Sequence, residues 1–266
     1  MKLFSFDADS DKIYVLINIF GKNFKYRKTG YAYIIKNKYW DFIFWFLRLF
    51  IKKNYHIIPM GTYCFARTAT TFNKLKPRRK QGEKSCPFDL ALYYNYDTIL
   101  NLLDTEFKDF YKDMYFDKKR KWWCNDDLSV EMGHDSMLLE LPEFKARYDK
   151  RIQNLYDYFA DKKAHKYIFI ATKLQISISQ IEKLFNILYR YMNAKEFDVI
   201  LLNQTDRENT YKRDHLYIIN HNKFFKEYDD ILMNWAGEIK TRRSPSAQKI
   251  YNDFTLKMIK ILSKRR

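Results

Sequence analysis

Apolar residues along the chain follow two spacings, and the order of these spacings predicts the secondary structure. Four short runs rich in β-branched and aromatic residues predict buried strands; they cover residues 55–60, 166–172 (KYIFIAT), 197–203 (FDVILLN) and 215–220 (HLYIIN). Apolar positions three and four apart predict helices over residues 65–75, 94–111, 142–160, 178–192 and 245–262. Because strands that alternate with helices are typical of βαβ units, we expect an α/β fold, a three-layer sandwich with a mostly parallel sheet.

The N-terminal region has its own pattern. Residues 12–21 (KIYVLINIFG) and 31–36 (YAYIIK) predict a short β-hairpin with Gly21 at its turn. We therefore expect two parts: residues 1–53, which carry this hairpin and an amphipathic helix, and residues 54–266, an α/β domain that holds the candidate chemistry.

The amphipathic helix is expected within residues 39–53 (YWDFIFWFLRLFIKK). Its apolar positions leave only a thin polar edge, but Asp41 and Arg48 interrupt them and the stretch is shorter than the ~20 residues of a spanning helix. The pattern fits a helix that lies in a membrane interface, with Lys52 and Lys53 toward the headgroups. It fits equally well a buried helix that covers one side of the sheet.

Composition and charge narrow the class of protein. The chain has 266 residues and is 47% hydrophobic, which excludes a disordered protein and suffices for one well-filled core. The net charge of +17 suits nucleic acid, but the basic residues are scattered among acidic ones and no RNP, KH or zinc-finger pattern occurs. We expect no nucleic-acid partner. An anionic membrane surface or a phosphorylated small substrate fits the same charge.

The cysteines indicate a reducing compartment. Cys64, Cys86 and Cys124 are widely spaced and odd in number, and they lack the paired spacing of a zinc site or a redox dithiol. We expect no metal. The first residues, MKLFSFDADSDK, contain acids where a signal peptide has a basic region followed by an apolar one. We expect a cytoplasmic protein, with peripheral contact to the inner face of the cytoplasmic membrane as an option.

Cys64 is the first candidate for catalysis. It follows the strand at residues 55–60 and Gly61, and it precedes the helix that begins at residue 65. A thiol at a helix N-terminus faces unpaired N–H groups and the positive end of the helix dipole, which stabilise a thiolate and a developing oxyanion. A lone cysteine is also a common apolar filler of a core.

A nucleophilic cysteine needs a base and an acid that orients it. Of the five histidines, four lie at expected strand ends or in an exposed turn: His56, His165, His215 and His221. His134 lies in a loop (VEMGHDSM) and is followed by Asp135, so we select it as the base. Asp89, before an apolar run, fits a helix N-cap and also an acid that orients His134.

Several motifs occur in an order that resembles a known family. They are MGTYC (60–64), SCPFDL (85–90), GHD (133–135), ARYDKRIQNLYDYF (146–159) leading into KYIFIAT, and WAGEI (235–239). This set, over about residues 55–240, resembles a mostly bacterial family of papain-like cysteine peptidases whose domain has no known function. The resemblance implies that Cys64, Asp89, His134 and Asp135 form the catalytic site.

Details of the resemblance bear on the substrate. Leu90 stands where the family usually has Trp, and Ala171, Thr172 and Lys173 replace the usual end of the strand, which implies a changed substrate or a lost anionic contact. We assign substrate binding to a further set: Gly61, Thr62, Tyr63, Arg151 and Lys173. Of the two acids we favour Asp89, because neighbouring side chains in an extended loop point to opposite sides.

The fold expected here is not the one that the resemblance implies. A papain-like cysteine begins a long helix packed against an antiparallel barrel, whereas this chain alternates strand and helix in the parallel manner. We therefore expect a Cys-His-Asp site on a different scaffold. Such a site suits acyl transfer to a sugar hydroxyl, and coenzyme A is a candidate acyl donor, although the scheme requires no cofactor.

Residues 12–28 (KIYVLINIFGKNFKYRK) resemble the lead hairpin of bacterial proteins of surface-polysaccharide assembly, such as capsule or lipopolysaccharide. The first functional hypothesis is thus a cysteine-dependent acyl-transfer enzyme, hydrolase or acyltransferase, with a small-molecule or glycan substrate in that pathway. A noncovalent glycosyltransferase-like enzyme of the same pathway is the second. A noncatalytic membrane-peripheral scaffold, with Cys64 as a core residue, is the third.

Overall fold

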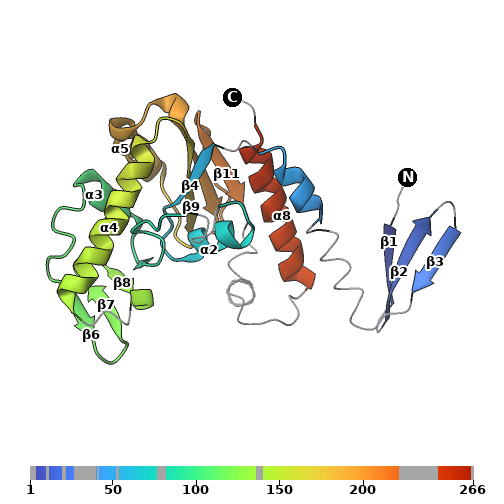
Figure 1. Ribbon diagram of the computed structural model, residues 1–266, viewed down its shortest axis with the longest axis horizontal. Helices are drawn as coiled ribbons and strands as arrows, with labels where there is room; N and C mark the ends of the chain where they lie inside the picture. Colours follow the sequence, from blue (N-terminus) through green and yellow to red (C-terminus); the bar gives the residue numbers. More distant parts are fainter. Residues whose placement is uncertain are drawn as a thin grey trace. The chain divides into compact units, whose positions relative to one another are not determined.

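The computed structural model describes the following residues: 4–9, 12–19, 22–26, 40, 42–51, 54–76, 82–135, 140–221 and 245–264. The chain divides into two compact units, Met1–Ile51 and Lys52–Arg266. Strands β1 (Phe4–Asp9), β2 (Lys12–Ile19) and β3 (Lys22–Tyr26) of the first unit form an antiparallel sheet in the order β1-β2-β3 (Figure 1). Gly21 and the strand expected at 31–36 lie outside the described residues.

The segment expected to be amphipathic is helical at residues 42–48 and continues into a turn at 49–50. Backbone N–H groups of Leu49, Phe50 and Ile51 bond to the carbonyl oxygens three residues earlier, which closes the helix with a tighter last turn. Across the described ranges, every helix is too short or too polar to cross a bilayer.

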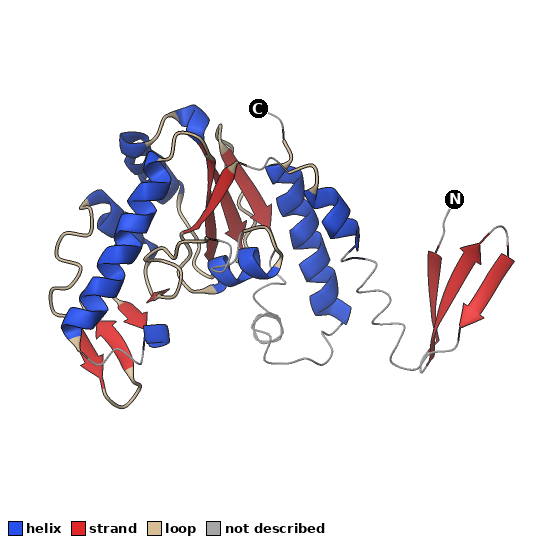
Figure 2. Cartoon of the chain, in the orientation of Figure 1, coloured by secondary structure: helices blue, strands red, loops and turns tan. Residues whose placement is uncertain are grey.

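A parallel sheet of four strands organises the second unit, in the order β11-β10-β9-β4 (Figure 2). The strands are β4 (Tyr55–Pro59), β9 (His165–Thr172), β10 (Phe197–Asn203) and β11 (Leu216–Asn220). Every residue of β10 is buried, as expected for a central strand covered on both faces. The four predicted strands, their parallel direction and the α/β class are confirmed.

The helices described in the second unit are α2 (Phe65–Phe72), α3 (Tyr96–Asp104), α4 (Leu141–Ala160), α5 (Ile178–Tyr191) and α8 (Pro245–Leu262), with a short 3-10 turn η3 (Ala194–Glu196) after α5. Alternate residues of β9 meet different helices. Ile168 and Ile170 belong to the same core cluster as residues of α3, α4 and α5. Phe169, between them, lies 5.9 Å from the ring of Phe254 in α8.

A second, antiparallel sheet has the order β5-β8-β7-β6 and is open, not a barrel, within the described chain. Its strands are β5 (Leu92–Tyr93), β6 (Tyr115–Asp117), β7 (Trp122–Asn125) and β8 (Val130–Met132). The sequence pattern predicted no strands in this region, and of the helix that it predicted over residues 94–111 only α3 is observed. Strands of two to four residues are too short to display a period of two, and left-handed backbone at Glu106, Phe107 and Asp109 ends the helical stretch.

An aromatic stack attaches the antiparallel sheet to α4. The ring of Phe144 in α4 lies 4.7 Å from that of Trp123 in β7 and 4.6 Å from that of Tyr148 one turn further along α4. Phe144 and Tyr148 are fully buried. Packing of these rings therefore fixes the sheet against the helix.

Phe144→Ala should lower the free energy of unfolding by about 3–5 kcal/mol, because it removes a fully buried ring and leaves a cavity in the stack. Tyr189→Ala is the matched control, since Tyr189 is 40% exposed and its loss should cost about 1 kcal/mol or less. Urea denaturation measures both. Equal losses in the two variants would contradict the stack.

Candidate active site

The turn that carries Cys64 lies at the carboxyl end of β4. After this strand the backbone N–H of Met60 donates to the carbonyl oxygen of Phe169 (2.8 Å), and that of Thr62 donates to Ala171 (3.3 Å). A Cβ atom on Gly61 would lie only 2.5 Å from the carbonyl oxygen of Ala171. Glycine is therefore required for the close approach to β9, and the chain then enters α2 with Cys64 at its N-cap.

The thiol of Cys64 is half-buried and makes no capping hydrogen bond. Burial raises the pKa of Cys64 above its ordinary value, and its own backbone N–H and the charge of Arg67 only partly oppose this rise. The N-terminus of α2 thus offers the expected position for a nucleophile, but in this geometry the thiol is mostly protonated at neutral pH.

Other predicted substrate-binding residues gather at the carboxyl ends of the parallel strands. The Thr62 hydroxyl donates to that of Thr172 (3.1 Å), and the Tyr63 hydroxyl donates to Oε1 of Gln204 (2.8 Å). The ammonium of Lys173 lies 5.7 Å from the centre of the Tyr63 ring. Ligands of open parallel sheets bind at this edge, so these groups lie where a substrate is expected.

His134 lies in the 3-10 turn η2 (Gly133–Asp135), directly after β8. Its side chain is exposed, and within the described residues it makes no hydrogen bond to Cys64, Asp89 or Asp135. The pairing of Cys64 with His134 stays a prediction.

Asp135 is fully buried beside two arginines of α4. Its carboxylate accepts hydrogen bonds from Arg151 (2.9 and 3.1 Å), Arg147 (2.9 Å) and the hydroxyl of Tyr148 (3.2 Å). Burial alone would raise the pKa of Asp135, but the hydrogen bonds and charge of Arg151, followed by those of Arg147, hold it below the ordinary range. Asp135 was predicted to be catalytic and Arg151 to bind substrate. In the structure the two side chains form an ion pair with each other.

Asp89 is also fully buried, in a separate cluster of charges. It accepts the backbone N–H of Cys86 (3.0 Å), and Nε of Arg67 lies 3.5 Å from the same carboxylate oxygen. Arg67 also donates to Glu83 (3.2 Å), which pairs with Lys76 at 2.9 Å. Burial raises the pKa of Asp89, against the charges of Lys76 and Arg67. Asp89 thus caps a turn and anchors α2, the helix that begins at Cys64.

Sequence reasoning missed Arg67, Lys76, Glu83 and Arg147 as parts of this site. The burial of Arg151 was predictable from the sequence, because Arg151 lies on the same face of α4 as the buried residues Phe144, Tyr148 and Leu155, at spacings of three and four residues. An arginine on such a face needs a buried acid as a partner. Lys76 and Glu83 offered no signal, since they lie in a charged stretch typical of a solvated surface.

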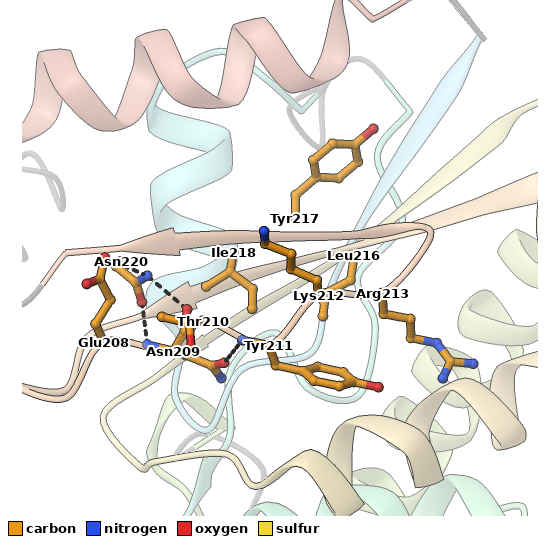
Figure 3. A pocket seen from close by; sticks show the side chains of 10 residues that line it. All are labelled: Glu208, Asn209, Thr210, Tyr211, Lys212, Arg213, Leu216, Tyr217, Ile218 and Asn220. Atoms are coloured by element: carbon orange, nitrogen blue, oxygen red, sulfur yellow. Dashed lines mark hydrogen bonds between the residues drawn. The ribbon is translucent and has the colours of Figure 1, made fainter.

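A hollow of about 430 Å³ lies beside β11 and the loop before it (Figure 3). Its lining residues are Glu208, Asn209, Thr210, Tyr211, Lys212, Arg213, Leu216, Tyr217, Ile218 and Asn220. Figure 3 shows Tyr211 and Arg213 on the same side of β11 as Leu216, with Tyr217 on the opposite side. Tyr211 and Arg213 both donate to Glu182 of α5. None of the predicted catalytic residues lines this hollow.

Comparison of the chain with protein-family models, with curated proteins and with solved structures finds no match. The resemblance to papain-like cysteine peptidases therefore stays a prediction from the motifs. Over the described ranges, no group of three or more His, Cys, Asp or Glu side chains is arranged to hold a metal ion.

Asp135→Asn should lower the free energy of unfolding at pH 7 by about 3–5 kcal/mol, because it leaves the buried guanidinium of Arg151 without its carboxylate. The folded pKa of Asp135 lies below its unfolded value, so its contribution is complete above about pH 4 and is lost as the pH falls through the folded pKa. The difference between wild type and variant should shrink accordingly in chemical denaturation below pH 4.

Asp89→Asn is the matched control, since the pKa of Asp89 is raised whereas that of Asp135 is lowered. Its carboxylate becomes less favourable to folding as the pH rises from the unfolded pKa through the folded one. The variant should therefore lose less stability than Asp135→Asn at pH 7. Equal or larger losses for Asp89→Asn would contradict this account of the two acids.

Gly61→Ala should destabilise the fold by about 1–3 kcal/mol, because the added methyl group meets backbone that is part of the sheet. Gly82→Ala is an informative comparison: nothing lies within 4 Å of its added Cβ, so any loss there arises from its left-handed backbone (φ 87°) alone. Thermal denaturation with the thiols kept reduced measures both. A stable Gly61→Ala variant would show that the turn into α2 can shift.

Proposed function

We propose that the protein is an enzyme that uses Cys64 as the nucleophile of acyl transfer, acting as a hydrolase or an acyltransferase. One observation carries the proposal: Cys64 is the N-cap of α2 at the carboxyl edge of the parallel sheet, and its thiol is not used in capping the helix. The first turn of a helix carries N–H groups that have no partner within the helix, and such groups can stabilise a developing oxyanion.

The reaction follows from this position. The thiolate attacks the acyl carbonyl carbon, the C–S bond forms and the leaving group departs with a proton, which gives a thioester. Water or a sugar hydroxyl then attacks the thioester carbonyl and gives up its proton, the C–S bond breaks, and the sulfur takes up a proton, which releases the acid or the acylated sugar. His134 is the residue that we assign to these proton transfers, because it is an exposed imidazole on a turn whose neighbour Asp135 is held by α4.

The wider setting that we propose is bacterial surface-polysaccharide assembly, with a glycan or small-molecule acceptor. It is supported by the resemblance of residues 12–28 and by the net charge of +17, which suits phosphate-bearing donors such as coenzyme A. We also propose that the parallel sheet is the middle of three layers. This is supported by Figure 1, in which α4 and α5 lie on one side of the sheet and α8 on the other, and by the different partners of Ile168 and Phe169.

A second candidate is a noncovalent glycosyltransferase-like enzyme. The hollow beside β11 favours it, since its volume suits a sugar nucleotide and its lining includes Lys212, Asn209 and the ring of Tyr211. The raised pKa of Cys64 also favours a reaction without a thiolate. In this candidate Cys64 has no chemical role.

The pH dependence of iodoacetamide labelling, read by mass spectrometry, separates the two candidates. Burial alone raises the pKa of Cys64, so half-maximal reactivity below about pH 8.5 would require an added partner, and we expect that shift to disappear in His134→Ala. The buried thiols of Cys86 and Cys124 are internal controls that should stay unlabelled. A Cys64 profile at or above the ordinary pKa, unchanged in His134→Ala, would exclude the thiolate enzyme.

Activity provides the second measurement. With p-nitrophenyl acetate or acetyl-coenzyme A as the acyl donor, Cys64→Ala should abolish turnover and the acetyl adduct on the protein, and should shift the melting temperature by less than about 3 °C. Cys86→Ser should retain turnover but lower the melting temperature, since it places a hydroxyl in the core. Retained turnover in Cys64→Ala would favour the noncovalent candidate.

A further inference from the structure

The segment at residues 42–50 exposes an unusual number of large apolar side chains. Five of its side chains are about half exposed or more: Phe42 (61%), Trp45 (55%), Phe46 (48%), Leu49 (61%) and Phe50 (61%). Their spacing of three, one, three and one residues places all five on one side of the helix and its last turn. We call this set the aromatic face.

The same segment has a second, buried side. Phe44 is 1% exposed and Ile51 is 8% exposed, so this side of the segment is covered. The exposed rings are also ordered among themselves: those of Phe42 and Trp45 lie 5.8 Å apart, and those of Phe46 and Phe50 lie 5.3 Å apart. The aromatic face is therefore apolar surface that the helix leaves exposed on the side opposite Phe44 and Ile51. Single exposed apolar residues are ordinary, but contiguous ones indicate a binding surface.

The charges around the aromatic face indicate what it binds. Between residues 36 and 53 the sequence has five basic residues, Lys36, Lys38, Arg48, Lys52 and Lys53, and the single acid Asp41. Aromatic side chains flanked by basic residues match the two parts of an anionic bilayer surface, since rings partition into the interface and cations are attracted to the headgroups. A protein partner would require a complementary apolar patch and has no such need for flanking cations.

We propose that the aromatic face of residues 42–50 inserts into the surface of a bilayer that contains anionic phospholipids, and holds the protein there as a peripheral membrane protein. The helix lies parallel to the bilayer plane, with Phe42, Trp45 and Phe50 among the acyl-chain ends and Phe44 on the side away from the bilayer. This proposal is independent of the chemistry at Cys64.

Flotation with vesicles tests the proposal. The full chain should float with vesicles of phosphatidylcholine plus 30% phosphatidylserine, and should bind vesicles of phosphatidylcholine alone at least tenfold more weakly. Phe42→Ser/Trp45→Ser/Phe50→Ser should reduce binding to the anionic vesicles by about 100-fold or more while leaving the melting temperature unchanged. The matched control is Leu174→Ser/Ile178→Ser/Tyr189→Ser, which removes three other exposed apolar side chains (36%, 55% and 40% exposed) and should bind like wild type.

The depth to which the aromatic face inserts into the bilayer is measured by the fluorescence of Trp45. Brominated lipids should quench its fluorescence in the wild type, and Trp45→Phe should bind the vesicles normally with most of that quenching lost. Recovery of the wild type in the soluble fraction with both kinds of vesicle would overturn the proposal. So would a dimer in light scattering that the aromatic-face variant abolishes while vesicles recruit neither protein, since the aromatic face would then be a contact between copies of the chain.

Discussion

The pairing of buried charges is the constraint on which the candidate site depends. Asp135 carries its carboxylate into the interior because Arg151, Arg147 and Tyr148 all meet it from α4. A lone buried carboxylate would cost several kcal/mol, so the turn η2 can occupy this place only while α4 supplies those partners. His134, the residue before Asp135, therefore takes its position from a helix that begins several residues later in the chain.

A similar set of paired buried charges positions Cys64, the candidate nucleophile. Arg67 lies in the first turn of α2, one turn after Cys64, and its guanidinium is shared between Glu83 and Asp89. These acids belong to the segment that leads into the antiparallel sheet, so this segment and α2 cannot move apart without separating buried charges. Burial lowers the pKa of Arg151, but Tyr148 and Asp135 raise it above its ordinary value, and Asp89 adds a smaller contribution in the same direction. The two charge clusters are thus electrostatically coupled, and a shift of either one alters the field at the other.

The sequence predicted those parts of the fold in which burial decides the pattern. Residues 197–203 are all buried in β10, and an unbroken apolar run of that length is typical of a central strand. The antiparallel sheet was not predictable in this way, because its strands are short and its turns depend on left-handed residues such as Lys121 and Ser129. For the site, motif order singled out Asp89 and Asp135, but which cation each acid meets depends on tertiary contacts between distant segments.

These contacts also bear on how Cys64 can ionise. A helix N-terminus and a neighbouring arginine are the usual means of lowering a thiol pKa, and both are present, yet burial prevails. Desolvation is the largest influence on the thiol, and Arg67, which is paired with Glu83 and Asp89, only partly offsets it. A thiolate at Cys64 therefore requires a further positive group or proton acceptor that comes near it when substrate binds. His134 is an exposed imidazole and is the residue that we propose for this role, whereas the two candidate acids, Asp89 and Asp135, are buried.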